Sequence, residues 1–287
     1  MDSGDDMPVL PADTLALLQD FQKTQVAQLE AFKKLQDKAE SRFDDADTQQ
    51  QRNPLEDDDA DESEADSPLQ TMEFFTEDWN LSQFWYTDLT ARTLSAFVLD
   101  PLVKVPLDLN SIPIPHPEFE SMPDIKIAII SAPTVHQYLT YKILPLLPQA
   151  MRRKIKCVVL EHDSRFALFG NQFVHYDFNE PTRLPGWSKG AFTGVIIDPP
   201  FLSTECQVKT AITARLLLPK VDNDEERRKQ KVVVCTGQKV EDVILRTYKN
   251  YGIRRTSFDP EHRNGLANEF RCFANSEIEG VWSFTRT

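Results

Sequence analysis

The sequence has few cysteines and no long apolar segment. Its four cysteines, Cys157, Cys206, Cys235 and Cys272, lie 49, 29 and 37 residues apart and form no CxxC pair. This spacing excludes a zinc ribbon and gives no sign of a disulfide framework. No apolar run reaches the roughly 18 residues that a membrane-spanning helix needs, and the first ten residues lack the apolar core of a signal peptide. We therefore expect a cytoplasmic protein that has no metal site and does not associate with a membrane.

A surplus of positive charge is also missing. Nineteen of the 45 acidic residues, but only six of the 32 basic residues, fall within residues 1–68, so the remaining chain has 26 of each. The whole net charge of −13 thus belongs to the N-terminal part. Proteins that bind nucleic acid need clustered Lys and Arg to displace counterions from the phosphates. The charge balance therefore argues against a nucleic-acid partner.

The composition divides the chain into three parts. Residues 1–43 contain an amphipathic helix over 12–40, which either packs on the body of the protein or binds a partner. Residues 44–72 are rich in Asp and Glu and poor in apolar residues, which predicts a disordered acidic linker. Residues 73–287 form the third part. It has a proline-rich insertion at 100–123, which can form neither a regular helix nor a central strand and is expected to be an extended loop.

The third part predicts an α/β fold. A helix is expected at about 89–99, and the sequence after residue 124 alternates between short apolar runs and helical segments. The runs are uniformly apolar, as in parallel strands that are buried on both faces. The expected strands are 125–131, 156–163, 173–178, 191–198 and 231–237, followed by two terminal strands at 252–258 and 268–275. The polar segment 220–231 is expected to be a loop.

The ends of the predicted strands are the place to look for a site, because ligands of such sheets bind beyond the carboxyl ends of the strands. The first strand leads to Ser131 and Ala132, and the next three lead to Glu161, Asp177 and Asp198. An acid after the second strand is well placed to accept hydrogen bonds from ribose hydroxyls, and one after the third could accept from an adenine amine. Each could equally be a capping or solvated carboxylate. The first turn, SAPTV, has no glycine, which argues against a pyrophosphate and leaves a nucleoside without phosphates.

The fourth strand ends in Asp198, Pro199, Pro200 and Phe201. The carboxylate and a proline carbonyl form two fixed acceptors, and the aromatic ring beside them can stack on another ring or attract a cation. Such a pair suits an amino group, whose attack on an electrophilic methyl group requires mainly positioning. The alternative is a proline-stiffened connection without a catalytic role.

Several segments together resemble the eukaryotic elongation factor 1-alpha lysine methyltransferase family, which was earlier described as an adenine-N6 DNA methyltransferase family. They are LSQFWY (81–86), EHDSRFALFGNQFVHYDFNEP (161–181), DPPFLSTEC (198–206), CTG (235–237) and LANEFRCFAN (266–275). The resemblance implies a seven-stranded, Rossmann-like class I methyltransferase fold with a terminal antiparallel hairpin. It also implies methyl transfer from S-adenosyl-L-methionine to a lysine of translation elongation factor 1-alpha.

The resemblance further implies roles for single positions. Residues 198–201 match the amine-binding motif, Glu161 matches the acid expected at the ribose, and Asp177 matches the acid expected near the adenine. Residues 84–86 match an aromatic segment that covers the cofactor or the substrate, and 268–270 match a segment to which no role is assigned. The residues expected to bind the cofactor are Phe84, Trp85, Tyr86, Ser131, Ala132, Glu161, Asp177 and Asp198.

Two other functions stay open at this level. Adenine-N6 methylation of nucleic acid would use the same DPPF chemistry, with Phe201 stacked on a flipped base, but the charge balance argues against it. A non-catalytic scaffold that recruits a partner through the N-terminal helix is supported by the glycine-free first turn. For a lysine substrate, Asp198 would orient the amine while water, His162 or Tyr86 takes its proton.

Overall fold

The computed structural model describes residues 53–56, 72, 75, 77, 83–266 and 268–285. The amphipathic helix predicted for the N-terminal part, and most of the predicted acidic linker, lie outside the described residues. The described residues cover most of the third part of the chain and a few positions that precede it.

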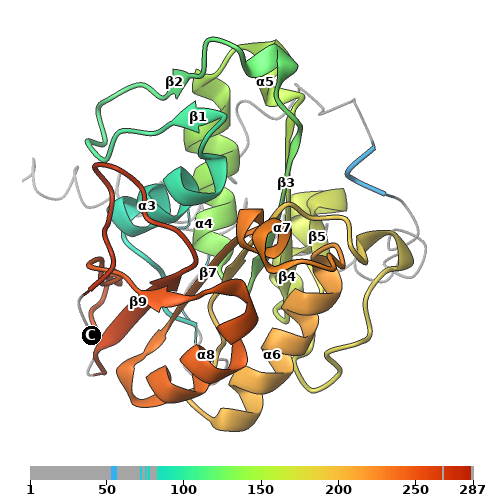
Figure 1. Cartoon of the computed structure of the whole chain (residues 1–287), viewed down its shortest axis with the longest axis vertical. Helices are drawn as coiled ribbons and strands as arrows, with labels where there is room; N and C mark the ends of the chain where they lie inside the picture. The colour runs from blue at the N-terminus through green and yellow to red at the C-terminus, as the bar shows by residue number, and fades with distance from the viewer. Residues whose placement is uncertain are drawn as a thin grey trace, which may run out of the picture.

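A seven-stranded sheet forms the centre of the molecule (Figure 1). Its strands are β3 (Ile125–Ile130), β4 (Ile155–Glu161), β5 (Phe173–His175), β6 (Gly194–Ile197), β7 (Lys231–Gly237), β8 (Arg254–Arg255) and β9 (Phe270–Ala274). Their order across the sheet is β5-β4-β3-β6-β7-β9-β8. The first five in this order run parallel, while β9 is antiparallel to both β7 and β8. This topology confirms the predicted Rossmann-like methyltransferase fold with its terminal antiparallel strands.

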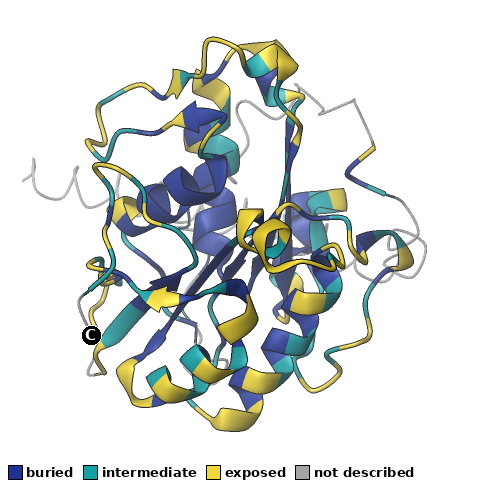
Figure 2. Cartoon of the chain, viewed as in Figure 1, coloured by how far each residue is buried: buried dark blue, intermediate teal, exposed yellow. Residues whose placement is uncertain are grey.

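Both faces of the sheet are buried, which explains why the strands are uniformly apolar in sequence. Along β3, Ile127 and Ile129 belong to the apolar cluster that contains residues of helices α3 (Asp88–Leu99) and α4 (Pro133–Tyr138). Ala128 and Ile130 belong to the cluster that contains residues of helices α6 (Thr204–Leu217) and α8 (Glu241–Thr247). All four are fully buried. Figure 2 shows the central strands in dark blue, with the equally buried helices α3 and α4 on one face and the helices α6 and α8, which have exposed outer surfaces, on the other. Alternate residues of a strand thus pack against opposite helix layers.

Helices cover the two faces of the sheet (Figure 1). The α-helices are α3 (Asp88–Leu99), α4 (Pro133–Tyr138), α5 (Gln149–Arg152), α6 (Thr204–Leu217), α7 (Asp224–Lys229) and α8 (Glu241–Thr247). Short 3-10 helices are formed by Phe119–Ser121, Leu144–Leu146, Ser164–Gln172, Gly186–Ser188, Gln238–Val240 and Lys249–Tyr251, and a π-helical turn at Leu139–Ile143 continues α4. The predicted helix at about 89–99 is confirmed as α3. It begins after Thr87, whose side chain accepts a hydrogen bond of 3.2 Å from the backbone N–H of Thr90.

The polar segment predicted to be a loop at 220–231 contains helix α7, so that prediction is wrong. Asn223 caps the helix by accepting a hydrogen bond of 2.7 Å from the backbone N–H of Glu226. Acidic residues occupy its first turn and basic residues its last, and none of its residues is buried. The helix is therefore stabilised by its cap and by charges that complement its dipole, and it has no apolar face that periodicity could reveal.

The proline-rich insertion is held in place by a buried arginine. Arg92 of α3 is 2% exposed and donates hydrogen bonds to the backbone carbonyls of Pro106 and Ser111. Two short strands within the insertion, β1 (Val103–Lys104) and β2 (Ile114–Pro115), pair antiparallel. The insertion is thus a loop fastened to α3, with a small two-stranded sheet that was not predicted.

Five of the described residues, 53–56 and Met72, lie within the predicted acidic linker. Residues 53–56 form a turn in which the Leu55 N–H donates a hydrogen bond of 3.1 Å to Asn53 Oδ1. Leu55 is 6% exposed and belongs to the apolar cluster that contains residues of α6 and α8. The predicted disorder does not hold at residues 53–56, because an apolar side chain there has a core to pack against.

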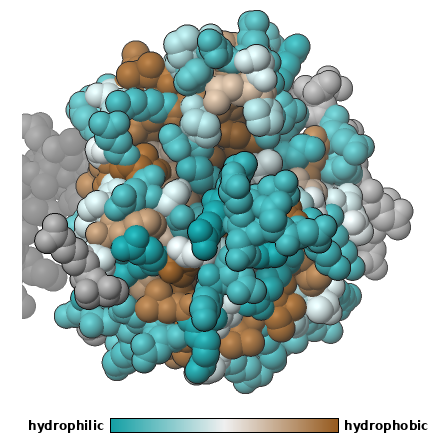
Figure 3. All heavy atoms as spheres, in the orientation of Figure 1, coloured by the Kyte–Doolittle hydropathy of each residue, from teal (hydrophilic) through white to brown (hydrophobic). Residues whose placement is uncertain are grey.

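The face of the molecule seen in Figure 3 is mostly hydrophilic, with apolar side chains in separate patches. Within the described part of the chain, no helix is both long and apolar enough to cross a membrane.

Candidate active site

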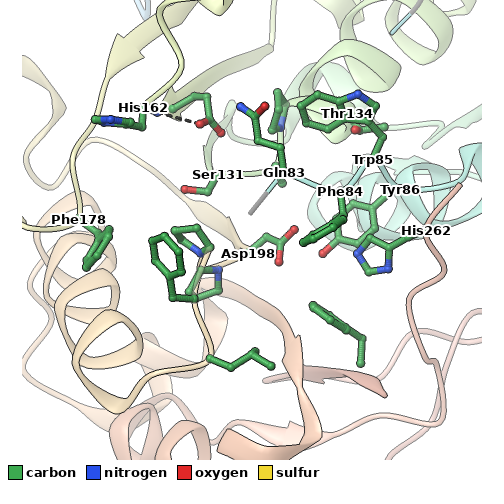
Figure 4. A pocket seen from close by; sticks show the side chains of 18 of the residues that line it. Gln83, Phe84, Trp85, Tyr86, Ser131, Thr134, His162, Phe178, Asp198 and His262 are labelled. Atoms are coloured by element: carbon green, nitrogen blue, oxygen red, sulfur yellow. Dashed lines mark hydrogen bonds between the residues drawn. The ribbon is translucent and has the colours of Figure 1, made fainter. Parts of the chain in front are cut away.

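A cavity of about 500 Å³ opens at the carboxyl ends of β3, β4, β5 and β6, and this volume lies in the range of small-ligand pockets. His162 and Phe178 lie toward one end of it, and Tyr86 and His262 lie toward the other (Figure 4). The cavity is lined by all eleven residues that the sequence indicated, namely Phe84, Trp85, Tyr86, Ser131, Ala132, Glu161, Asp177, Asp198, Pro199, Pro200 and Phe201. The structure therefore brings these residues together at one place, while their roles stay predictions.

The turn after β3 is tight although it contains no glycine. Ser131 has a φ of 55°, in the left-handed region that glycine normally occupies. Its N–H donates a hydrogen bond of 2.9 Å to the Leu160 carbonyl, and α4 begins two residues later with Pro133. The chain therefore passes from strand to helix as sharply as a glycine turn would. The lack of glycine, which supported the scaffold hypothesis, does not prevent a close approach of the backbone to a ligand.

Glu161 ends β4 and is 6% exposed. Its Oε1 accepts hydrogen bonds from the backbone N–H groups of His162, at 2.9 Å, and Asp163, at 3.3 Å. Burial raises the pKa of this carboxyl to about 7, although those hydrogen bonds oppose the rise. A carboxylate held by the backbone at the end of the second parallel strand can accept hydrogen bonds from a diol.

Asp177 follows β5 and is held in a turn. Its Oδ1 accepts a hydrogen bond of 2.8 Å from the backbone N–H of Asn179. The next residue, Phe178, contributes a ring to the same end of the cavity and packs edge-on against Phe201, with the ring centroids 5.6 Å apart. This end of the cavity thus combines a carboxylate with aromatic faces.

Asp198 follows β6 and is half-buried beside the cavity. Its N–H donates a hydrogen bond of 3.0 Å to the Ile130 carbonyl of the neighbouring strand, which fixes its backbone. Burial raises the pKa of this carboxyl to about 8, and the nearby charge of Glu161 adds to the rise, while the Tyr86 hydroxyl opposes it. Asp198 is therefore a carboxyl that can bind or release a proton near neutral pH.

The aromatic segment 84–86 is tied to the body on both sides of the cavity. The Trp85 indole Nε1 donates a hydrogen bond of 2.7 Å to the Phe75 carbonyl, and its ring packs edge-on against Phe166. The preceding Gln83 donates a hydrogen bond of 2.8 Å to Asp163, next to the end of β4. These contacts hold the segment firmly, so Phe84 and Tyr86 are fixed against the cavity.

The sequence analysis missed His262, which forms part of the wall near Asp198. Its ring lies 4.7 Å from that of Tyr86 and 4.8 Å from that of Phe270, measured between centroids. Burial lowers the pKa of His262 to about 4, so it is a neutral ring at physiological pH. His262 comes from the connection between β8 and β9, whose sequence gave no signal. Phe270 lies in a segment that was noted, but its role was not assigned.

Fold and site together define the class of the protein. The sheet is parallel with an antiparallel end, carboxyl groups stand at three successive strand ends, and the last of them opens a DPPF turn. The three carboxyl groups of Glu161, Asp177 and Asp198 line one cavity together with aromatic rings. The protein is a methyltransferase of the Rossmann-like class.

Comparison with known proteins narrows this class. Residues 77–278 match the family model described as "Probable N6-adenine methyltransferase". The chain is 34% identical over 280 residues to the protein-lysine N-methyltransferase EFM5 of Saccharomyces cerevisiae, covering 96% of this chain and 94% of that protein. It is 35% identical over 282 residues to the protein-lysine N-methyltransferase M142.8 of Caenorhabditis elegans, covering 96% and 97%. It is 29% identical over 272 residues to the human EEF1A lysine methyltransferase 1, covering 94% and 93%.

The chain belongs to this family, the family of the EEF1A lysine methyltransferases, as its motifs suggested. It is an enzyme, and the relatives carry the name of protein-lysine N-methyltransferases although the family model is described by adenine methylation.

Proposed function

We propose that this protein transfers a methyl group from S-adenosyl-L-methionine to a lysine side chain of translation elongation factor 1-alpha, in the cytoplasm. The observation that carries the proposal is the setting of Asp198. Its carboxyl lies in the cavity between the side of His162 and Phe178 and the side of Tyr86 and His262 (Figure 4), and the Tyr86 hydroxyl is close to it. The names of the relatives support a lysine of elongation factor 1-alpha as the acceptor.

The cavity residues fit the proposed cofactor. The backbone-held carboxylate of Glu161 suits the two ribose hydroxyls, and Asp177 suits the adenine amine. The turn at Ser131, together with Ala132, lets the backbone approach the ligand, and the aromatic segment 84–86 covers it. When bound, S-adenosyl-L-methionine supplies an electrophilic methyl group on a positively charged sulfur.

The part of the cavity around Asp198 fits a lysine side chain. A lysine arrives as an ammonium, with a pKa of roughly 10.4 in water, and a carboxylate together with the faces of aromatic rings attracts such a cation. Removal from water lowers the pKa of the amine, while the pKa of Asp198 is raised to about 8. The two pKa values thus approach each other, so Asp198 can orient the amine and also accept the proton that must leave before attack. The Pro199 carbonyl is the second acceptor that we expect to hold the amine.

This role for Asp198 goes beyond the expectation from sequence, in which it only orients the amine. It also distinguishes lysine from adenine as acceptor. The exocyclic amine of adenine is neutral and needs acceptors but no negative charge. The methylated amine of either acceptor loses a proton after the transfer, but only an acceptor that arrives as an ammonium must also lose one before attack, and a carboxyl with a raised pKa suits that step.

The test is a methylation assay with purified elongation factor 1-alpha and, in parallel, with adenine-containing DNA and RNA, followed by mass spectrometry. We expect methyl groups on a lysine of the protein and none on adenine. The Asp198→Ala variant should be inactive while its circular dichroism spectrum is unchanged. Methylation of adenine alone would overturn the proposal, as would full activity of that variant. Calorimetry with S-adenosyl-L-methionine decides against the scaffold hypothesis if the cofactor binds.

A further inference from the structure

The hydroxyl of Tyr86 is a buried polar group that the proposed mechanism does not yet use. Tyr86 is 1% exposed. Its hydroxyl lies beside the Asp198 carboxyl and the Cys235 thiol, close enough for each to affect its pKa, but it forms no hydrogen bond of normal geometry with a described residue. Leaving a buried hydroxyl unsatisfied costs stability, so the position of this hydroxyl destabilises the folded state.

The backbone around Tyr86 is fixed, so the hydroxyl cannot easily move away from Asp198. Tyr86 forms an isolated antiparallel bridge with His262. On either side of it, the Thr87 N–H donates to the Glu261 carbonyl at 2.9 Å, and the Arg263 N–H donates to the Trp85 carbonyl at 2.8 Å. Figure 4 shows the Tyr86 side chain directed into the cavity on the side where Asp198 lies. These two main-chain hydrogen bonds, which make up the bridge, fix the backbone from which the hydroxyl reaches Asp198.

Among the described groups that face the Asp198 carboxyl, the Tyr86 hydroxyl is the best hydrogen-bond donor. Glu161, from β4, is a carboxyl and adds negative charge, and the Asp198 backbone N–H is already engaged with Ile130. Cys235, from β7, is a buried thiol opposite Cys272 of β9, and a thiol is a weak donor. Burial and the charge of Asp198 both raise the pKa of Tyr86, so its hydroxyl keeps its proton and can donate it.

We propose that Tyr86 is a positioning residue for Asp198, whose hydroxyl donates a hydrogen bond to the ionised carboxylate and so fixes the oxygen that faces the substrate amine. Only the activity measurements that test this inference depend on the proposed function. In the protein without substrate, the carboxyl holds its proton, and a neutral carboxyl is a weaker acceptor for the hydroxyl than an ionised one. When an ammonium enters, the carboxyl releases its proton to water, and one oxygen of the carboxylate accepts from Tyr86 and the other from the amine.

The test removes only the hydroxyl, with Tyr86→Phe, and uses Tyr248→Phe as the matched control. Tyr248 is also fully buried with a hydroxyl that has no partner among the described residues, but it does not line the cavity.

For Tyr86→Phe we expect kcat on elongation factor 1-alpha to fall about tenfold, the size of one hydrogen bond to a charged group. The affinity for S-adenosyl-L-methionine should stay the same. The acid limb of the kcat/KM profile should move to higher pH, because the carboxylate has lost a donor. Tyr248→Phe should change neither the rate nor the profile.

A second measurement does not depend on activity. The loss of thermal stability between pH 5 and pH 9 should be steeper in Tyr86→Phe than in the parent, and this difference should vanish in the background of Asp198→Asn. The inference is overturned if Tyr86→Phe behaves like Tyr248→Phe in both measurements, or if its effect on the pH dependence persists without the Asp198 carboxyl. If the parent does not methylate elongation factor 1-alpha, the proposed function fails, whereas the stability measurement still decides the coupling between Tyr86 and Asp198.

Discussion

Replacing Asp198 by Asn tests both the chemistry and the electrostatics of the site. The amide keeps the shape and one acceptor oxygen of the side chain, but it has no negative charge and takes up no proton. For a lysine that arrives as an ammonium, we expect the rate of methyl transfer to fall by at least about a hundredfold, the scale of a lost proton acceptor. For a neutral adenine amine the same change would be tolerated. The residual activity of Asp198→Asn therefore reports the charge of the acceptor.

The same substitution should stabilise the protein at alkaline pH. The pKa of Asp198 rises from 3.8 to about 8 on folding, so between these values the folded state binds a proton that the unfolded chain does not. The free energy of unfolding of the parent therefore decreases as pH rises through this window and stays low above it. At 1.36 kcal/mol per pKa unit the limit is roughly 6 kcal/mol. Because Asp198 is half-buried beside an open cavity, solvent reduces this, and we expect about 1–3 kcal/mol.

Thermal unfolding of both proteins between pH 4 and pH 9 measures this difference. For a domain of this size, 1–3 kcal/mol corresponds to a rise in Tm of about 3–10 °C for Asp198→Asn at pH 9. The difference in Tm should be smallest at the acid end, because the parent's carboxyl is then neutral in the folded state and only partly ionised in the unfolded chain. A constant difference at every pH, or a variant that is less stable at pH 9, would refute the reasoning.

Three further substitutions test other parts of the site. Glu161→Gln should weaken binding of S-adenosyl-L-methionine at least about tenfold, because it loses a charged acceptor; unchanged affinity in calorimetry would remove Glu161 from the ribose. Ser131→Val should lower the free energy of unfolding by about 1–3 kcal/mol in urea titrations, because a β-branched residue is strained at a φ of 55°, whereas Ser131→Gly should be tolerated. Trp85→Ala should cost about 3–5 kcal/mol by loss of its packing on Phe166, and a loss below 1 kcal/mol would show that the aromatic segment is not part of the core.

The arrangement of the strands was open to prediction because it depends on burial. Parallel strands covered on both faces, such as β3 and β4, must be apolar at nearly every position. Helix α7 could not be predicted in this way, because a short helix held by its cap and end charges has no apolar stripe. The turn at 53–56 was missed for the opposite reason. A single Leu55 in an acidic stretch has no periodicity, and only the folded body shows that it has a place to pack.

The residues of the candidate site also fall into two groups, those that could be predicted from the sequence and those that could not. Glu161, Asp177 and Asp198 could be found because parallel strands bring their carboxyl ends to one edge. The left-handed turn at Ser131 could not, because serine gives no sign of a positive φ. His262 could not either, because it reaches the site from a long connection whose position depends on the pairing of β8 with β9.

The insertion of β9 between β7 and β8 has a consequence for synthesis of the protein on the ribosome. Phe270, which begins β9, lines the cavity, and β9 covers the edge of β7 that would otherwise be unpaired. Both features need β9, which is translated after the other six strands of the sheet, so a nascent chain can assemble the cofactor end of the site before the wall beside Asp198. Until β9 has left the ribosome, the edge of β7 stays open to wrong partners. Activity should therefore begin only once β9 has emerged, and nonsense mutations before residue 270 should yield inactive, aggregation-prone protein.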